Sequence, residues 1–459
     1  MTKPIEIKEY KEKKKSELQD LDLTGLRKYL KRQKLENVLD VYADSIKANS
    51  WVGIIKYKKT TIQILPKLIS PNGDKEDYKN DEEYKADKET ILKNLIYMLS
   101  FTKKLNIKTN EVAKLSKEKN PFLEILIREY ANSLFECLKR LTPQKYIREE
   151  NNLNYLKGKI KFSENIRYNC SNSAKFYCEY DEYSENNILN QLFLFVSTCL
   201  YYITNNGYNK KTLKLIMNYY SDIELVRFYK FKANKIKLSR NQELFKKPFM
   251  LAKMFIENST IDLTNTKIEN IILLWDMNKL FEEFVFELLK RNENKNGLEG
   301  WKFTAQKGKL LLIDSTAKSQ NTSFQESSLR ASERGVAIQN RMTNVDIYAE
   351  NNETNEKVII DTKYKKFETL DDVANSDIYQ VTAYCLLHGA GKGILLYPKW
   401  DKTEHQKEGY YLNSDVIKDL KINFKTVNLK KDLREELKKK DNKIIGDLKK
   451  LFETEVNKE

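Results

Sequence analysis

The chain has 459 residues, of which 40% are hydrophobic and 32% are charged, and its formal net charge at pH 7 is +16. This length is too great for one ordinary hydrophobic core and predicts two or three domains. The composition excludes a fibrous or intrinsically disordered protein. The positive charge favours a partner that carries phosphate groups, such as DNA, although lysine, asparagine, isoleucine and tyrosine are abundant along the whole chain.

No stretch of the sequence predicts a membrane span, because the most apolar run, Leu192 to Ile203, is shorter than the roughly 20 residues that cross a bilayer. Alternating charges follow the basic N-terminus, so we expect no secretory signal and an intracellular, cytoplasmic protein. The 5 cysteines include no CxxC pair, which argues against a disulfide framework and a zinc site. With only 2 histidines, carboxylates and lysines must carry any catalysis.

Residues 1–145 are predicted to form a β-hairpin plus a helical region. A helical pattern covers Leu23 to Leu35, and two apolar runs, Trp51–Tyr57 and Thr61–Leu65, predict the hairpin. The polar, acidic segment from Ser70 to Lys88 is typical of a surface loop or linker. Apolar residues at helical spacing over 91–99 and 122–138 predict two helices, which we expect to pack as an antiparallel pair.

The rest of the chain is predicted to form a mostly helical middle region, 146–260, and a third region, 261–459, that combines strands and helices. The expected class is therefore a multidomain α+β or α/β protein, with an N-terminal mixed β/helical region and a C-terminal mixed sheet flanked by helices. The middle region contains helical patterns over Asn187–Tyr202 and Leu213–Tyr220. In the third region we expect an amphipathic helix around 277–289, strands over 301–304, 309–313, 344–349, 358–364 and 393–397, a helix over 371–388 and a basic helix at the C-terminus.

Two carboxylates and a lysine lie on neighbouring strands of the third region. Side chains alternate along a strand, so Asp361 and Lys363 share one face. The preceding strand carries Asp346 and is connected by a short polar turn, so a hairpin would bring Asp346 close to Asp361. Magnesium prefers oxygen ligands and keeps several waters, and two aspartates are therefore enough for a site that the substrate completes. These residues predict a Mg²⁺ site for phosphodiester hydrolysis, in which Lys363 orients or deprotonates water and stabilises charge on the phosphate.

The same strand end has a simpler interpretation, because an Asp-Thr-Lys sequence at a surface commonly forms a turn or an exposed ion pair. The helix that follows carries Gln380 and Tyr384, which are four residues apart and share one helix face. They could also be a partly buried polar residue beside a core tyrosine. The order of the elements favours the catalytic interpretation: a helix with an acidic residue, the two strands, and then this helix.

This order resembles the PD-(D/E)xK nuclease superfamily, and the Gln-x-x-x-Tyr pair is similar to the motif of its RecB-like branch. The resemblance implies Mg²⁺ as the cofactor, Asp346 and Asp361 as metal ligands, and Lys363, Gln380 and Tyr384 in the catalytic site. One departure is that Val345 stands where the superfamily has a proline, so Asp314 stays an alternative to Asp346. The resemblance also implies an acidic ligand on the leading helix, for which Glu282 is favoured over Glu283 and Glu287.

Further segments resemble the McrC family. The resemblance spans roughly Gly53 to Pro398, which is most of the chain. Its residues are Ile64-Leu65-Pro66-Lys67, Gly158-Lys159-Ile160, the run from Phe176 to Asn187 that includes Tyr-Asp-Glu-Tyr-Ser, Asp276 to Glu282, and Asp377-Ile378-Tyr379-Gln380.

The resemblance implies a nuclease subunit of a modification-dependent, antiviral restriction system that cleaves methylated DNA. Its implied partner is McrB, an AAA+ GTPase, whose GTP hydrolysis the N-terminal part of the chain is expected to stimulate. The sequence has no P-loop, which agrees with a subunit that relies on a separate motor. Basic and aromatic residues between Arg148 and Arg167 are candidates for contacts with the partner or with DNA. Two alternatives stay open: a non-catalytic adaptor that activates a ring motor, and a stand-alone RecB-like nuclease.

Overall fold

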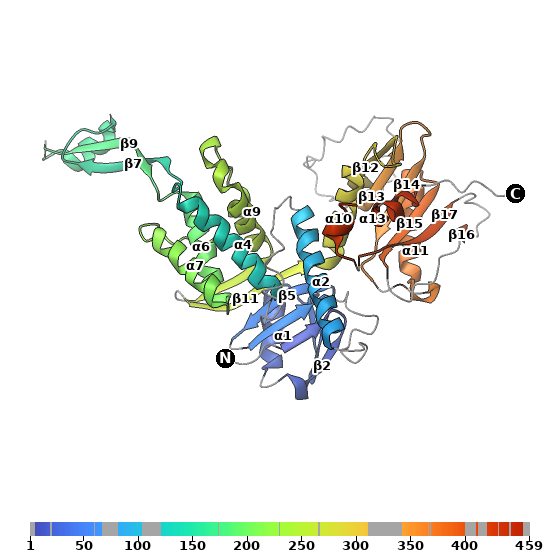
Figure 1. Cartoon of the computed structure of the whole chain (residues 1–459). Helices are drawn as coiled ribbons and strands as arrows, with labels where there is room; N and C mark the ends of the chain where they lie inside the picture. Colours follow the sequence, from blue (N-terminus) through green and yellow to red (C-terminus); the bar gives the residue numbers. More distant parts are fainter. Residues whose placement is uncertain are drawn as a thin grey trace, which may run out of the picture. The chain divides into compact units, whose positions relative to one another are not determined.

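The computed structural model describes the chain in two compact units, each built from two separate segments of sequence. Unit 1 comprises Met1–Leu65 and Leu105–Trp275, and unit 2 comprises Pro66–Lys104 and Asp276–Glu459. Figure 1 shows their helices and strands. The described residues are 5–18, 21–58, 60–66, 81–102, 121–172, 174–228, 230–264, 267–310, 342–365, 367, 369–399, 410–411, 420–429, 431–439 and 442–452.

The centre of unit 1 is a five-stranded sheet with the strand order β1-β6-β5-β11-β10. Strands β5 and β6 form an antiparallel hairpin, β1 is parallel to β6, and β10 and β11 form a second hairpin. Strand β11 lies beside β5 although more than 200 residues separate them in sequence (Figure 1). The strand bounds are Ile5–Lys8 for β1, Trp51–Tyr57 for β5, Thr60–Leu65 for β6, Ser259–Thr264 for β10 and Lys267–Asp276 for β11.

A glycine allows β5 and β11 to approach closely. Gly53 has φ +142°, and a Cβ atom at this position would lie 2.1 Å from the carbonyl oxygen of Leu273. Only glycine fits such a contact without a shift of the backbone. Apolar side chains of the sheet then pack on helix α1, Leu23–Arg32, whose first turn is capped by the carboxylate of Asp22. A small sheet with the order β2-β4-β3 adjoins this core, with strands Glu12–Lys14, Ser45–Ala48 and Leu39–Val41.

The remainder of unit 1 is a group of packed helices and a separate sheet. Helix α4 packs on α7 and α9, and α6 packs on the same two helices. The separate sheet has the strand order β7-β9-β8, and helix α5 packs on β9. The bounds are Pro121–Leu138 for α4, Ile188–Ile203 for α6, Gly207–Tyr219 for α7, Lys230–Asn234 for α8, Lys246–Glu257 for α9, Lys145–Leu153 for β7, Lys159–Ile160 for β8, Phe162–Asn169 for α5 and Phe176–Ser184 for β9.

Unit 2 is built on a six-stranded mixed sheet with the order β12-β13-β14-β15-β17-β16. The pairs β12–β13 and β13–β14 are antiparallel, whereas β14, β15 and β17 run parallel to one another. The bounds are Trp301–Leu310 for β12, Met342–Asn351 for β13, Lys357–Thr362 for β14, Lys392–Pro398 for β15, Tyr410–Tyr411 for β16 and Lys421–Val427 for β17.

Five helices accompany this sheet. Helix α10 packs on β12, β13 and β14, α11 packs on β14 and β15, and α13 packs on β17. Helix α2 packs on α10 and α12, and the Asn94 side chain ties it to the C-terminal segment by donating to the carbonyls of Leu429 and Lys431. The bounds are Asp81–Thr102 for α2, Met277–Arg291 for α10, Asn375–His388 for α11, Leu433–Glu436 for α12 and Lys443–Lys449 for α13.

Several sequence-based predictions are confirmed by the structure. The β5–β6 hairpin, helices α6, α7 and α10, strands β13, β14 and β15, and helix α11 all lie where the patterns indicate. The fold is a mixture of α and β elements, as expected. None of the helices among the described residues is long and apolar enough to cross a bilayer.

Other predictions were wrong. The helices over 91–99 and 122–138 do not pair, because α2 packs within unit 2 and α4 within unit 1. The loop predicted from Ser70 to Lys88 is wrong over its last part, because α2 begins at Asp81, while residues 70–80 lie outside the described residues. The two strands expected over 301–304 and 309–313 form one strand as far as Leu310. The basic C-terminal helix is divided into α12 and α13.

The predicted boundaries 1–145, 146–260 and 261–459 also differ from the two units. The middle region contains the β7–β9–β8 sheet in addition to its helices. The third region begins with strands β10 and β11, which complete the sheet of unit 1 instead of belonging to unit 2. Both differences arise from pairing between segments that lie far apart in sequence, which local patterns do not encode.

Candidate active site

Two aspartates meet on the antiparallel strands β13 and β14 of unit 2. The register pairs Ile347 with Ile360, so Asp346 and Asp361 lie opposite each other one position further along. The strands form here because their apolar residues are fully buried, with Ile347, Ile359 and Ile360 all 0% exposed. The hairpin that the sequence predicts therefore brings the two carboxylates together.

Asp346 is anchored by the residue that follows Asp361. Its Oδ2 accepts hydrogen bonds from the backbone nitrogen of Thr362 at 2.8 Å and from the Thr362 hydroxyl at 2.9 Å. Burial raises the pKa of Asp346, and these two hydrogen bonds oppose the increase. One oxygen of the carboxylate is thus held in place by the neighbouring strand.

Asp361 is almost fully buried, with 2% of its surface exposed. Its Oδ2 lies 2.8 Å from Lys363 Nζ, as a close ion pair without a well-aligned hydrogen bond. Burial and then the charge of Asp346 raise the pKa of Asp361 to about 6. This oxygen keeps lone pairs that could bind a cation.

Lys363 and the two predicted residues of helix α11 form a chain of hydrogen bonds. The Lys363 ammonium donates to Gln380 Oε1 at 2.8 Å, and Gln380 Nε2 donates to the Tyr384 hydroxyl at 2.9 Å. Burial acts to lower the pKa of Lys363, but the carboxylates of Asp361 and other nearby residues outweigh it, so the pKa is raised. Lys363 is therefore a cation in this environment.

Asp377 belongs to the same cluster, although the sequence patterns did not predict it as a site residue. It lies in the first turn of α11, is 7% exposed, and contacts Lys363 at 3.4 Å and Lys365 at 2.7 Å. Its helical spacing was the available signal, because Asp377 precedes Gln380 by three residues and so shares its helix face.

Glu282 on α10 reaches the cluster from a third element. The charge of Asp346 acts on it, and burial together with this charge raises the pKa of Glu282 to about 7. Of the two alternatives on the same helix, Glu287 forms an ion pair with Arg291 at 3.5 Å, whereas Glu283 also acts electrostatically on Glu282. Glu282 thus lies in the electrostatic field of Asp346, whereas the ion-pair partner of Glu287 is Arg291.

Gln306 holds Glu282 and was not foreseen from the sequence. Its side-chain amide donates to Glu282 Oε1. Gln306 lies between the pairs Ala305↔Ile347 and Lys307↔Val345, opposite Asp346, and has φ +50°. A glutamine with positive φ inside a strand marks a local irregularity, which changes the direction of the Gln306 side chain. No sequence pattern predicts such an irregularity. The alternative aspartate, Asp314, lies outside the described residues.

The donor set fits a hard divalent cation. Asp346, Asp361 and Glu282 carry carboxylate oxygens, and the charge of Asp346 raises the pKa of the other two, so a cation between them would relieve this repulsion. Among the described residues, no three Asp, Glu, His or Cys side chains already stand in the geometry of an assembled metal site. Two aspartates suffice for Mg²⁺, because this ion keeps several waters and is commonly completed by substrate phosphate.

The comparisons with known proteins define the class to which this chain belongs. The model of the family described as "McrBC 5-methylcytosine restriction system component" matches residues 46–398. The match covers more than half of the chain, so the protein is a component of this class of restriction system. Within that class the chain belongs to the McrC family, and the resemblance found in the sequence is confirmed.

Solved structures provide a further similarity. A chain in the refined half-complex from the tetradecameric assembly of Thermococcus gammatolerans McrB AAA+ hexamers with bound McrC matches with a TM-score of 0.62 and 21% identity, over 93% of this chain and 94% of that chain. At this identity the similarity shows a shared fold. A chain in the cryo-EM structure of the Thermococcus gammatolerans McrBC complex matches with a TM-score of 0.47 and 26% identity, over 64% of this chain and 89% of that chain. No curated protein matches the sequence significantly.

Proposed function

We propose that this chain is the Mg²⁺-dependent DNA endonuclease subunit of a type IV, McrBC-like restriction system. We further propose that it cleaves methylated DNA together with an AAA+ GTPase partner and stimulates the GTP hydrolysis of that partner. The observation that supports catalysis is the junction of Asp346, Asp361 and Lys363 at one end of the β13–β14 pair. Membership of the McrC family supports the partner and the restriction role.

The metal would be held by Asp346 and Asp361, with Glu282 as the third carboxylate. A bound Mg²⁺ would act as a Lewis acid that neutralises negative charge on the phosphate, and it would lower the pKa of a bound water molecule. Thr362 holds Asp346 through two hydrogen bonds, and Gln306 holds Glu282, so both carboxylates are oriented before substrate arrives.

Lys363 acts in this proposal as a cation. Its raised pKa makes it a poor base, so its contribution is to stabilise negative charge on the phosphate and to orient water. Gln380 Oε1 accepts a hydrogen bond from the Lys363 ammonium. The Tyr384 hydroxyl accepts a hydrogen bond from the Gln380 amide and so fixes its orientation. The side chains of α11 thereby restrict the direction in which the ammonium points.

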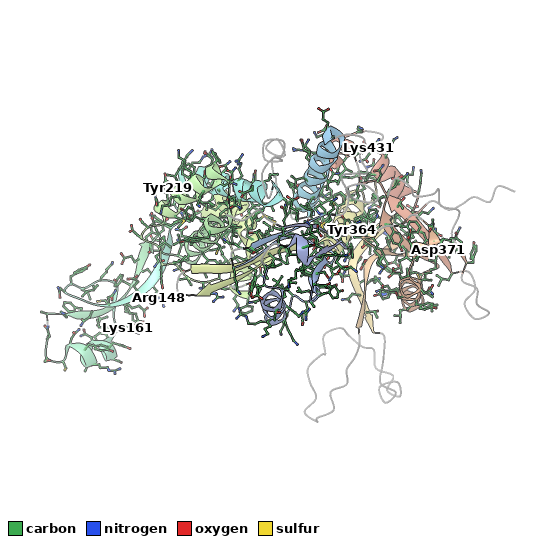
Figure 2. The ribbon with its side chains drawn as sticks, turned by 90° about the horizontal axis from the view of Figure 1, so that it is seen from below. Arg148, Lys161, Tyr219, Tyr364, Asp371 and Lys431 are labelled. Carbon is green, nitrogen blue, oxygen red and sulfur yellow. The ribbon has the colours of Figure 1, made fainter. Side chains whose placement is uncertain are left out.

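The β7–β9–β8 sheet with α5, residues 145–184, supports the proposal of a protein partner. We call this part of unit 1 the 145–184 module. It exposes large apolar side chains to solvent, among them Phe162 at 72% and Ile166 at 68%. Arg148 and Lys161 lie on the same module (Figure 2). Exposed apolar residues gathered on one small module are typical of a docking surface, and here the proposed occupant is the GTPase partner.

The test is cleavage of methylated duplex DNA by the full chain with the GTPase partner, GTP and Mg²⁺. We expect double-strand cleavage that disappears in Asp361→Ala, because this change removes a metal ligand. Asp371→Ala is a matched control, since it removes an exposed aspartate of the same unit. Cleavage by Asp361→Ala at the rate of the unaltered protein would refute the site.

The same experiment separates the two alternatives. A non-catalytic adaptor would stimulate GTP hydrolysis fully while no metal ion supports cleavage. A stand-alone RecB-like nuclease would cut DNA robustly in the absence of the partner and of GTP. Dependence of cleavage on the partner, GTP and Asp361 together supports the proposal.

A further inference from the structure

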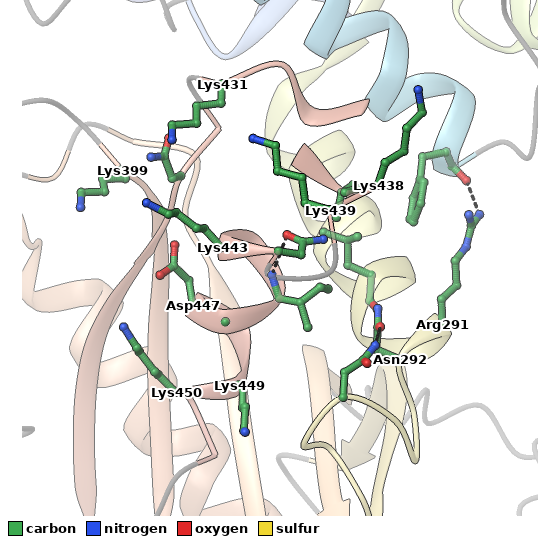
Figure 3. A pocket seen from close by; sticks show the side chains of 18 of the residues that line it. Arg291, Asn292, Lys399, Lys431, Lys438, Lys439, Lys443, Asp447, Lys449 and Lys450 are labelled. Carbon is green, nitrogen blue, oxygen red and sulfur yellow. Dashed lines mark hydrogen bonds between the residues drawn. The ribbon is translucent and has the colours of Figure 1, made fainter. Parts of the chain in front are cut away.

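Unit 2 contains a large groove whose lining includes none of the candidate active-site residues. It is lined by residues of α2, α10 and α13 and of the segments that follow α10, α12, β15 and β17, and its volume is about 1210 Å³. Figure 3 shows the side chains that line it. This volume exceeds the roughly 300–1,000 Å³ of pockets that enclose small molecules. Its size therefore suits a segment of a polymer better than an isolated small ligand.

The groove is strongly cationic. Seven lysines and Arg291 line it, and Asp447 is the one carboxylate among the described lining residues. Arg291, Lys438 and Lys439 form ion pairs with Glu287, Glu435 and Glu436, at 3.5, 2.8 and 2.8 Å. The other lysines form no ion pair with a described carboxylate, and they are Lys399, Lys431, Lys443, Lys449 and Lys450.

These unpaired lysines favour an anionic partner. In Figure 3 the side chains of Lys399, Lys443 and Lys450 lie around Asp447, so several positive charges share one short carboxylate. Positive charges gathered on one solvent-accessible surface repel one another, and a polyanion would relieve this repulsion. The lining also includes Asn292, Asn428 and Asn442, whose amide groups can donate to phosphate oxygens.

The sheet links this groove to the candidate active site. Strands β14, β15 and β17 are parallel, so their carboxyl ends lie at one edge of the sheet. Lys363 follows β14, Lys399 follows β15 and Asn428 follows β17. Neighbouring strands are about 4.8 Å apart, so the distance from β14 to β17 is about 10 Å. Phosphates of one DNA strand follow one another at about 3.4 Å along the helix axis, so this distance corresponds to roughly three phosphates.

We propose that this groove binds the sugar-phosphate backbone of the DNA duplex beside the point of cleavage. The proposal rests on the proposed nuclease function and adds to it a second binding surface. The groove would position the duplex without reading its sequence, because lysine contacts to phosphate carry no base information. Its contribution would be affinity that falls steeply with salt concentration.

The test uses the full chain without its partner, in EDTA, and a fluorescein-labelled 25-base-pair DNA duplex as the probe. The variant Lys399→Gln/Lys443→Gln/Lys450→Gln removes three groove charges. The control Lys31→Gln/Lys211→Gln/Lys214→Gln removes three exposed lysines of unit 1. A third variant with arginine at the three groove positions keeps the charge. Fluorescence anisotropy measures Kd between 50 and 200 mM salt.

We expect the glutamine variant to bind about tenfold or more weakly than the control, and the salt slope of log K to fall by about 2.7, which is 0.9 for each of three phosphate contacts. The arginine variant should retain most of the affinity, which separates lost charge from lost folding. Equal affinity and slope in the groove variant and the control would overturn the proposal. Two further measurements on the same variants use an RNA duplex of equal length and the GTPase partner as binding partners. A loss of binding confined to either of these, with DNA affinity unchanged, would also overturn the proposal.

The readout needs no Mg²⁺ and no cleavage, so it is independent of the proposed catalysis. Loss of binding in the groove variant, together with cleavage by Asp361→Ala, would refute the active site and keep the groove. Unchanged DNA binding by the groove variant, together with loss of cleavage in Asp361→Ala, would refute the groove alone.

Discussion

The carboxylate of Asp377, at the start of helix α11, lies 3.4 Å from the ammonium group of Lys363. The same carboxylate contacts Lys365 at 2.7 Å, so Asp377 joins the helix to the strand end that carries the proposed catalytic lysine. Asp377 touches neither substrate nor metal in the proposed mechanism and acts through Lys363. It is therefore a positioning residue.

Asp377→Asn should lower the cleavage rate at least about tenfold, because displacement of a catalytic group by about 1 Å can cost a factor of 10². The affinity of the metal-free protein for DNA should change little. Single-turnover cleavage and DNA binding, measured on the same variant, test whether the rate falls while the affinity is unchanged. Asp371→Asn is the control, since Asp371 is exposed on the same unit. A parallel loss of rate and affinity would contradict a positioning role.

Lys363→Met should abolish cleavage and also destabilise unit 2. The ion pair of Lys363 and Asp361 is buried, with 15% and 3% of the two side chains exposed. Removal of one partner of a buried pair typically costs about 3–5 kcal/mol, because the remaining charge has no counter-charge. Thermal unfolding in EDTA measures the loss. Addition of Mg²⁺ should restore part of the stability if Asp361 is a metal ligand, and an equal deficit in Mg²⁺ and EDTA would argue against that role.

In the metal-free protein, Glu282 and Asp361 should make the free energy of unfolding decrease as pH rises, which is the opposite of the usual effect of carboxyl groups. The pKa values of Glu282 and Asp361, about 7 and about 6, lie above the ordinary values of 4.5 and 3.8. Between these limits the two groups bind more protons in the folded protein than in the unfolded chain, so their contribution to the free energy of unfolding falls as pH rises from about 4 to 7. Urea unfolding in EDTA at several pH values between about 4 and 7 measures this free energy.

Glu282→Gln should reduce this fall in stability, whereas Glu287→Gln on the same helix should not. Mg²⁺ should also reduce it, because a metal binds the deprotonated carboxylates. A free energy of unfolding that rises with pH between 5 and 7 in the unaltered, metal-free protein would show that these carboxyl groups are not held in the buried cluster.

Tyr384→Phe should lower the cleavage rate about fivefold, a smaller effect than that of Asp377→Asn. The change removes one hydrogen bond, from Gln380 to the Tyr384 hydroxyl, and leaves the bond between Gln380 and Lys363 in place. Tyr379→Phe is a matched control on the same helix, because the Tyr379 side chain is 69% exposed. If both variants cleave DNA at the same rate, the Tyr384 hydroxyl has no part in the site.

The 145–184 module should be required for the partner and dispensable for DNA. Phe162→Ser/Ile166→Ser should reduce stimulation of GTP hydrolysis at least about tenfold, while DNA binding by the isolated chain is kept. Both residues are exposed, so the fold should tolerate the change. Phe231→Ser is the control, since Phe231 is 72% exposed on helix α8, outside the module. Full stimulation by the double variant would place the docking surface elsewhere.

Local patterns predicted the elements on which the candidate site is built. The strand-like runs that carry Asp346 and Asp361, with the short polar turn between them, predicted the hairpin, and helical spacing placed Gln380 and Tyr384 on one face. These patterns work because the strand period and the helix period depend on the backbone alone. The structure brings all four residues and Lys363 into one hydrogen-bonded and electrostatic cluster, while their catalytic roles are still predictions.

Other features depend on segments that are distant in sequence. Gln306 reaches Glu282 through an irregular strand position, and Asn94 ties α2 to a segment more than 300 residues away. Pairing of β11 with the N-terminal sheet divides the chain differently from any boundary drawn on composition. Such contacts are set by long-range packing, which leaves no periodic trace in one sequence.

The sequence by itself therefore determined the family and the order of helix, strand, strand and helix that carries Asp346, Asp361, Lys363, Gln380 and Tyr384. Only the tertiary structure decided that Asp377 and Gln306 contact this cluster and that the lysine after β15 and lysines of the C-terminal segment line one groove. The physical reason is that side-chain direction along a strand or helix is a local property. The meeting of charges from separate elements is decided by how those elements pack.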